Sequence, residues 1–208
     1  MSGTLHDFAS MSVRAFTAAL AGRTPAPGGG AVAALTAANA AALVSMVVEF
    51  SRGKNSFALF EGEADAILAS LDVTREACLA AAKADSDAYA SLSALWKLPK
   101  DDPARIARWK STVHAAIAAP QLIVALAAEI AGRCRVLAGS TAKQLDSDLA
   151  IAADLAGCAA RAAAWNVRVN LPSVADDEER TVIARALDRS LHVIDDDIKM
   201  THGVIERR

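Results

Sequence analysis

Aromatic residues are scarce in this chain, which has five phenylalanines, three tryptophans and one tyrosine among its 208 residues. It also has few runs of β-branched and aromatic residues bounded by turn residues, which a sheet would require. About one residue in four is alanine, the strongest helix former. The core must therefore be built from small aliphatic side chains, and the composition favours an all-α protein with closely packed helices.

Cysteine and net charge are also limited. The three cysteines lie far apart and form no CxxC pair, which argues against a disulfide framework and a structural zinc site. The four histidines lack the spacing of a metal motif, so no metal ion is expected. A net charge of −2 predicts no general affinity for nucleic acid. The N-terminus lacks the basic-then-apolar order of a signal peptide, so a cytoplasmic protein is expected.

Apolar periodicity and helix breakers predict one domain over residues 1–208, an antiparallel bundle of long alanine-rich helices. Breaks are expected at Gly53, at the segment 97–103, at Gly139 and at Pro172. The fourth helix is expected to kink or restart at Pro120. The predicted helices span about residues 5–21, 31–52, 59–96, 104–139, 144–171 and 176–208.

The uncharged stretch from Ala31 to Val48 is long enough to resemble a membrane span. It is mostly alanine, however, and it contains Thr36, Asn39 and Ser45. A helix that is apolar on all sides is either a core helix or a membrane helix. We expect a buried central helix and no membrane partner.

The glycine-rich segment PAPGGG, residues 25–30, precedes this apolar helix directly. It matches neither the dinucleotide-binding fingerprint nor the P-loop, and no predicted strand leads into it. Glycines at a helix start nevertheless allow backbone N–H groups to face a carboxylate, a phosphate or a polar ring. A tight turn for helix packing and a ligand-binding loop are equally good interpretations.

Several polar residues interrupt the apolar helices. Asp85 and Asp87 are two residues apart and point to different helical faces, so at least one is expected to face inward or into a cleft. A carboxyl group in such surroundings could act as a general acid or base, although solvation of both is the simpler reading. Asn166 and Asn170 share one helical face, which suits either an interhelical hydrogen-bond ladder or the lining of a polar pocket.

Three further polar positions have simple structural explanations. Asp148 lies near a helix start, where N-capping alone could account for it. Ser45 lies within the alanine-rich helix. Lys54 follows the C-terminal end of that helix, where basic residues are ordinary partners of the helix dipole. The residues alone thus support a small-molecule pocket in a helical domain without naming its ligand.

The order of these motifs resembles the cyclodeaminase/cyclohydrolase family of one-carbon folate enzymes. The resemblance rests on PAPGGG, AALVSMV at 41–47, the Gly53-Lys54 pair and the stretch from Asp85 to Tyr89. It continues through KLPK at 97–100, Pro120, SDL at 147–149, NVRVNL at 166–171 and VADD at 174–177. These motifs span nearly the whole chain.

The resemblance implies an all-helical homodimer with a folate site near the subunit interface. It also implies that a tetrahydrofolate derivative is the substrate and that no metal or other cofactor is needed. By position, it assigns Asp85 and Asp148 as the catalytic acids. It further implies a pocket lined or supported by Gly28, Gly29, Gly30, Ser45, Lys54, Asn166 and Asn170.

Two family activities remain open, hydrolysis of 5,10-methenyltetrahydrofolate to 10-formyltetrahydrofolate and cyclodeamination of 5-formimidoyltetrahydrofolate. No formiminotransferase part is recognisable in the chain, so the cyclohydrolase is the first expectation. A helical dimer that binds folate or a pterin without turnover is a further alternative, and so is a purely structural helical protein.

Overall fold

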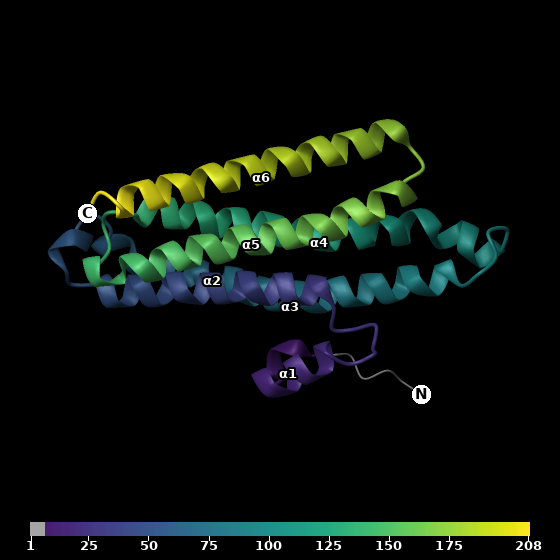
Figure 1. Ribbon diagram of the computed structural model, residues 1–208, viewed down its shortest axis with the longest axis horizontal. Coiled ribbons are helices and arrows are strands. Elements are labelled where there is room, and N and C mark those ends of the chain that lie inside the picture. Colours follow the sequence, from purple (N-terminus) through teal and green to yellow (C-terminus); the bar gives the residue numbers. More distant parts are fainter. Residues whose placement is uncertain (1–6) are drawn as a thin grey trace.

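The computed structural model describes residues 7–208, and in this range it contains helices and no strands, which confirms the all-α prediction (Figure 1). Short 3₁₀ turns connect several of the long helices. The six α-helices are α1 (Val13–Leu20), α2 (Gly29–Ser51), α3 (Ala64–Trp96), α4 (Pro103–Leu137), α5 (Asp146–Asn170) and α6 (Asp177–Ile205).

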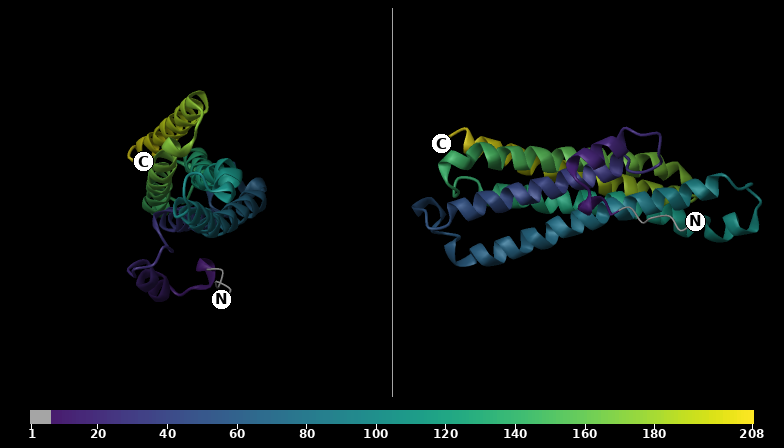
Figure 2. Two further views of the ribbon diagram at one scale, coloured as in Figure 1. Left: turned by 90° about the vertical axis from the view of Figure 1, so that its right-hand side faces the viewer. Right: turned by 90° about the horizontal axis from the view of Figure 1, so that it is seen from below.

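Four long helices, α2 to α5, form the bundle, and α6 packs along α4 and α5 on one side (Figures 1 and 2). The alanine-rich helix α2 is the central element that the sequence predicted, and it packs on α3, α4 and α5. Its buried positions are mostly alanine, which allows neighbouring backbones to approach closely. The predicted bundle of long alanine-rich helices is therefore confirmed.

Glycine ends two of these helices. Gly53 follows α2 with a φ of 71°, and Gly139 follows α4 with a φ of 85°. This left-handed conformation is typical of the residue after a helix C-cap, and glycine adopts it without steric cost. Both residues lie at breaks that the sequence predicted.

Two predicted boundaries were wrong. The first helix was expected over residues 5–21, but its N-terminal part falls on residues 1–6, which lie outside the described range, and α1 itself begins only at Val13. The hydroxyl of Ser12 caps α1 by accepting a hydrogen bond from the N–H of Ala15 (3.2 Å). The second error concerns the helix expected over residues 59–96, which begins only at Ala64, after two short 3₁₀ turns. At Pro120, where a kink or a restart was expected, α4 continues as one helix.

Helix α1 stands away from the bundle, and the segment that leads into α2 separates the two (Figures 1 and 2). None of its residues is buried. The preceding 3₁₀ turn, Phe8–Ser10, packs on α3, and the rings of Phe8 and Phe16 meet edge to face at 6.0 Å. The turn Phe8–Ser10 thus contacts the bundle directly, and Phe16 of α1 packs on the ring of Phe8.

The C-terminus is fastened to the start of α5. Arg208 donates hydrogen bonds to the carboxylate of Asp146 (2.6 Å) and to the carbonyl of Thr141 (3.2 Å). Nearby, the N–H of Ala142 donates to the buried hydroxyl of Ser51 (2.9 Å), which ties the end of α2 to the beginning of α5. Since the start of α2 lies beside the end of α5, these two helices run antiparallel.

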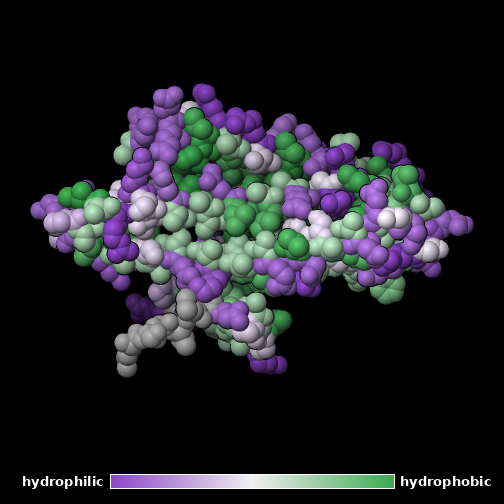
Figure 3. Space-filling model, turned by 180° about the vertical axis from the view of Figure 1, so that it is seen from behind, coloured by the Kyte–Doolittle hydropathy of each residue, from purple (hydrophilic) through white to green (hydrophobic). Residues whose placement is uncertain are grey.

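Helices α2 and α4 are each long and apolar enough to cross a membrane by length and composition. In each, 56% of the most apolar window is buried against other parts of the bundle, as in core helices of a helical domain. The face seen in Figure 3 carries a hydrophobic band across its middle, and hydrophilic residues gather toward the two ends.

Candidate active site

A cleft of about 340 Å³ lies where the start of α2 meets α3, α4 and the last turns of α5. This volume is within the range of small-molecule sites. The antiparallel packing of α2 and α5 places the glycine loop beside the C-terminal end of α5. The cleft thereby combines six of the nine residues that were predicted for the site, Gly28, Gly29, Gly30, Asp85, Asn166 and Asn170.

Gly30 lies directly against the Asp85 side chain in the cleft. A Cβ atom at Gly30 would lie 1.9 Å from Oδ2 of Asp85 and 2.2 Å from its Cγ. No side chain can therefore occupy position 30 while the Asp85 carboxyl group keeps its place. A Cβ at Gly29 would meet nothing within 4 Å. The glycine that the site requires sterically is thus Gly30, which lies in the first turn of α2.

Of the two neighbouring aspartates, Asp85 is the one that faces the cleft. Its side chain is half-buried and forms no hydrogen bond or ion pair with any residue in the range 7–208. Burial raises the pKa of the Asp85 carboxyl group above its usual value. Asp87 is exposed and pairs with Lys83 one turn earlier. The simpler reading, solvation, therefore holds for Asp87, whereas Asp85 has the surroundings of an acid-base group.

The N-terminus of α2 points into the same cleft. Its N-cap residue is Gly28, and no side chain of the described residues 7–208 caps the first N–H groups. The N-terminus of a 23-residue helix also carries a partial positive charge. Burial favours the neutral form of Asp85, while this helix end favours the charged form.

Asn166 and Asn170 line the cleft from the last turns of α5. The Nδ2 group of Asn170 donates a hydrogen bond to the carbonyl of Ala116 on α4 (2.9 Å). Both readings of this pair therefore hold in part, because Asn170 makes an interhelical bond and also lines the pocket. No partner of Asn166 is found among residues 7–208, so its amide is available to a ligand.

The sequence had not singled out the apolar wall of the cleft, which Tyr89, Trp96 and Val169 form. The rings of Tyr89 and Trp96 meet at 6.5 Å with an angle of 77°. Positions 85, 89 and 96 are four and seven residues apart, so they share one face of α3. This spacing was the signal that could have identified the two aromatic residues. Their faces offer stacking surfaces to a planar ring.

The other three predicted site residues lie toward the opposite end of the bundle. Asp148 is in the first turn of α5, and 18 residues at 1.5 Å each separate it from Asn166 by about 27 Å. Ser45 donates its hydroxyl hydrogen bond to the carbonyl of Ala41, and Lys54 is exposed after the end of α2. A single chain therefore does not bring Asp148, Ser45 or Lys54 to Asp85.

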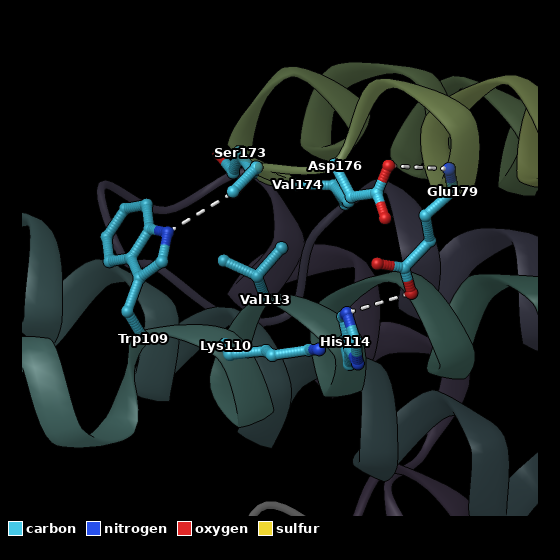
Figure 4. Close-up of a pocket in the computed structure, with 9 residues that line it drawn as sticks. Trp109, Lys110, Val113, His114, Ser173, Val174, Asp176 and Glu179 are labelled. Carbon is cyan, nitrogen blue, oxygen red and sulfur yellow. Dashed lines mark hydrogen bonds and ion pairs between the residues drawn. The ribbon is translucent and has the colours of Figure 1, made fainter.

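A second, smaller cavity of about 100 Å³ lies between α4 and the turn that joins α5 to α6 (Figure 4). The indole of Trp109 donates to the carbonyl of Ser173 (3.2 Å), and His114 lies 3.2 Å from the carboxylate of Glu179. Its polar groups thus bond one another across the helix junction, and the volume is below that of a typical ligand site. Within residues 7–208, no group of three His, Cys, Asp or Glu side chains could hold a metal ion.

Comparison with known proteins decides the family. The model of the family described as formiminotransferase-cyclodeaminase matches residues 12–189 of this chain. The chain belongs to the formiminotransferase-cyclodeaminase family. A member of solved structure, formiminotetrahydrofolate cyclodeaminase from Thermotoga maritima, superimposes with a TM-score of 0.86 at 26% identity, covering 96% of this chain and 98% of that one. The resemblance drawn from the sequence motifs is confirmed.

Two relatives of this chain are named for different activities. The formimidoyltransferase-cyclodeaminase of Gallus gallus is 28% identical over 198 residues, which is 93% of this chain and 37% of the relative. The methenyltetrahydrofolate cyclohydrolase of Methylorubrum extorquens is 28% identical over 169 residues, 79% of this chain and 81% of the relative. The chain thus spans little more than a third of the chicken protein but most of the bacterial one.

Proposed function

We propose that this chain is a one-carbon folate enzyme that hydrolyses 5,10-methenyltetrahydrofolate to 10-formyltetrahydrofolate. A carboxyl group without a partner among residues 7–208 carries this assignment, because Asp85 lies in the cleft against Gly30 with a pKa raised by burial. Similarity to a cyclohydrolase over most of that relative's length supports it. Both activities named among the relatives act on a carbon that N5 and N10 of tetrahydrofolate can share.

Asp85 performs the proton transfers of this reaction. Water adds to the cationic methenyl carbon, and the Asp85 carboxylate accepts the proton that the water loses. Asp85 then returns a proton to N5 as the bond between N5 and this carbon breaks. The remaining hydroxyl proton leaves as the formyl C=O forms on N10, so one proton is released per turnover. General acid-base catalysis of this kind contributes about 10²–10⁴-fold in rate.

The remaining groups of the cleft bind the substrate. The substrate is already a cation with an electrophilic carbon, so we propose that no metal or further cofactor takes part. Tyr89 and Trp96 offer stacking surfaces for the pterin ring, and the N–H groups at the start of α2 can bond its oxygen. Asn166 and Asn170 supply polar contacts at the opposite wall.

Asp85→Asn tests the assignment, and Asp87→Asn is its matched control on the exposed side of the same helix. We expect Asp85→Asn to lower kcat for methenyl loss by at least about 10²-fold, after correction for the spontaneous rate. Asp87→Asn should stay within about twofold of the unchanged protein. Wild-type kcat in a folded Asp85→Asn variant would remove the acid-base role.

The alternative is the cyclodeaminase reaction, in which N10 attacks the formimidoyl carbon and ammonia leaves. The similarity to the Thermotoga maritima cyclodeaminase over nearly the whole chain favours it. Parallel assays decide between the two, one following methenyl absorbance and the other following ammonia release from 5-formimidoyltetrahydrofolate. Binding of tetrahydrofolate in a calorimeter without either turnover would leave the non-catalytic alternative.

We further propose that two copies of the chain associate through the exposed faces of α2 and α5. Large apolar side chains remain exposed there, with exposed fractions of 63% for Phe50, 69% for Trp165 and 71% for Val169. The cleft lies at one end of these helices, and Asp148 and Lys54 lie toward the other. A two-fold axis perpendicular to α2 and α5 would bring Asp148 of one protomer toward the cleft of its partner.

Sedimentation measures the mass of the assembly, expected to be twice the chain mass of 21.5 kDa. Trp165→Glu should give monomers, whereas Val182→Glu, a control at an exposed position of α6, should not. Mixing inactive Asp85→Asn and Asp148→Asn proteins should restore activity, because mixed dimers contain one intact composite site. A monomeric wild-type protein contradicts the dimer, and a dimer without restored activity contradicts the shared site.

A further inference from the structure

Pro120 lies inside α4 and is buried, which is an unusual position for proline in a helix. Proline has no N–H group, so the carbonyl four residues earlier loses its helical hydrogen-bond donor. Here that carbonyl belongs to Ala116, a residue only 4% exposed. An unpaired carbonyl in such a buried place would be destabilising, so another donor is required.

Asn170 supplies this donor. Its Nδ2 group lies 2.9 Å from the Ala116 carbonyl oxygen, 54 residues away along the chain. Proline also displaces the carbonyl four residues earlier, because its ring would otherwise clash with it. The missing N–H thus leaves the Ala116 oxygen open to a side chain on α5. Both Ala116 and Asn170 line the cleft that contains Asp85.

The bond also decides which end of the Asn170 amide faces a ligand. A carbonyl oxygen can only accept, so the group that meets it must be the NH₂ end of the amide. The Oδ1 atom forms no hydrogen bond within residues 7–208, and it is not among the side-chain atoms that are both buried and unpaired. It therefore remains an accessible acceptor at the wall of the cleft.

We propose that Pro120 is a positioning residue, which frees the Ala116 carbonyl to hold the Asn170 amide with its oxygen toward the ligand. The ligand group that this oxygen selects is a hydrogen-bond donor. Given the proposed folate substrate, on which this inference rests, the donor is a ring N–H or the exocyclic NH₂ of the pterin. Asn170 binds the ligand directly, and Pro120 acts through it.

Pro120→Ala restores the N–H at position 120, which then competes for the Ala116 carbonyl. We expect an approximately tenfold increase in KM and in the Kd for tetrahydrofolate, with kcat changed less than twofold, because ground-state and transition-state binding weaken together. Asn170→Ala should have a similar effect. The double variant should be no worse than Asn170→Ala alone, because the two residues act in series.

Pro103→Ala is the matched control, since Pro103 lies in the first turn of the same helix, where no carbonyl four residues earlier loses a helical donor. It should leave KM within twofold. Circular dichroism should show Pro120→Ala folded and at least as stable as the unchanged protein, because alanine is the better residue inside a helix. Unchanged KM and Kd in Pro120→Ala, or additive effects in the double variant, would overturn the positioning role.

A readout without turnover separates this inference from the proposed function. The side-chain NH₂ resonances of Asn170, assigned by their loss in Asn170→Ala, should shift toward the free amide values in Pro120→Ala and not in Pro103→Ala. Unmoved resonances would show that the proline does not control the amide. A wild-type protein that neither binds nor converts folates would refute the proposed function. The NH₂ resonances would still show whether Pro120 positions the Asn170 amide.

Discussion

Replacing Gly30 by alanine adds a single methyl group where α2 lies against the Asp85 side chain. That methyl carbon would lie 1.9 Å from Oδ2 and 2.6 Å from Oδ1 of Asp85, whereas an ordinary contact is 3.4 Å or more. The carboxyl group must therefore retreat by about 1.5 Å for Oδ2 alone to reach that contact distance. It can do so by rotating its own side chain, because the clash involves only the end of a flexible group.

The expected effect falls on catalysis rather than on folding. Alanine stabilises a helix relative to glycine by up to about 1 kcal/mol, which offsets the local rearrangement. A displacement of about 1 Å from the reacting geometry can lower the rate about 10²-fold. We therefore expect Gly30→Ala to fold with a Tm close to that of the unchanged protein and to lose about 10²-fold in kcat.

Gly29→Ala is the matched control, because it makes the same chemical change one residue earlier with nothing within 4 Å of the new atom. Its kcat at saturating substrate should stay within about threefold of the unchanged protein. The assay follows methenyl absorbance, and ammonia release serves if the cyclodeaminase reaction is the active one. Equal kcat values for the two variants would refute the contact between Gly30 and a catalytic Asp85.

Three further outcomes are expected. Because burial raises the pKa of Asp85, its charged form destabilises the fold above that pKa. Asp85→Asn should therefore raise the Tm at pH 7, and this gain should vanish as the pH falls below 3.8, the ordinary pKa of an aspartate side chain. An equal gain in Tm at pH 7 and below pH 3.8 contradicts the burial of this carboxyl group. Burial raises the pKa of Cys78 and of Cys134 to about 12, whereas Cys158 is exposed. Maleimide should therefore label only Cys158 quickly in the folded chain and all three thiols after denaturation. Mass spectrometry measures the number of labels on each chain. Arg208→Ala removes a half-buried ion pair at the start of α5 and should lower the free energy of unfolding in urea by about 2 kcal/mol. An unchanged free energy of unfolding contradicts the stabilising role of this pair.

Local sequence was enough to predict the helices and several of their ends. Alanine content and the breaks at Gly53 and Gly139 depend on backbone preferences of single residues, and these preferences act without tertiary contacts. The sequence left a kink and a restart at Pro120 as alternatives, because the local preference of proline does not decide between them. Proline disfavours a helix locally. Inside the bundle, however, the Ala116 carbonyl accepts a hydrogen bond from Asn170 on α5 in place of the missing helical donor, and α4 continues through Pro120.

For the site, the sequence by itself determined the residue types: a run of glycines before a helix and an aspartate in an alanine-rich neighbourhood. Only the tertiary structure decided that Asp85 rather than Asp87 faces inward, that Gly30 is the glycine without room for a side chain, and that the cleft forms at the end of α5 remote from Asp148. Spacing within one helix follows from its 1.5 Å rise, so sequence reveals shared faces. The register between helices depends instead on side-chain packing among residues far apart in the chain, and that register placed the glycines, the carboxyl group and the amides around one cleft.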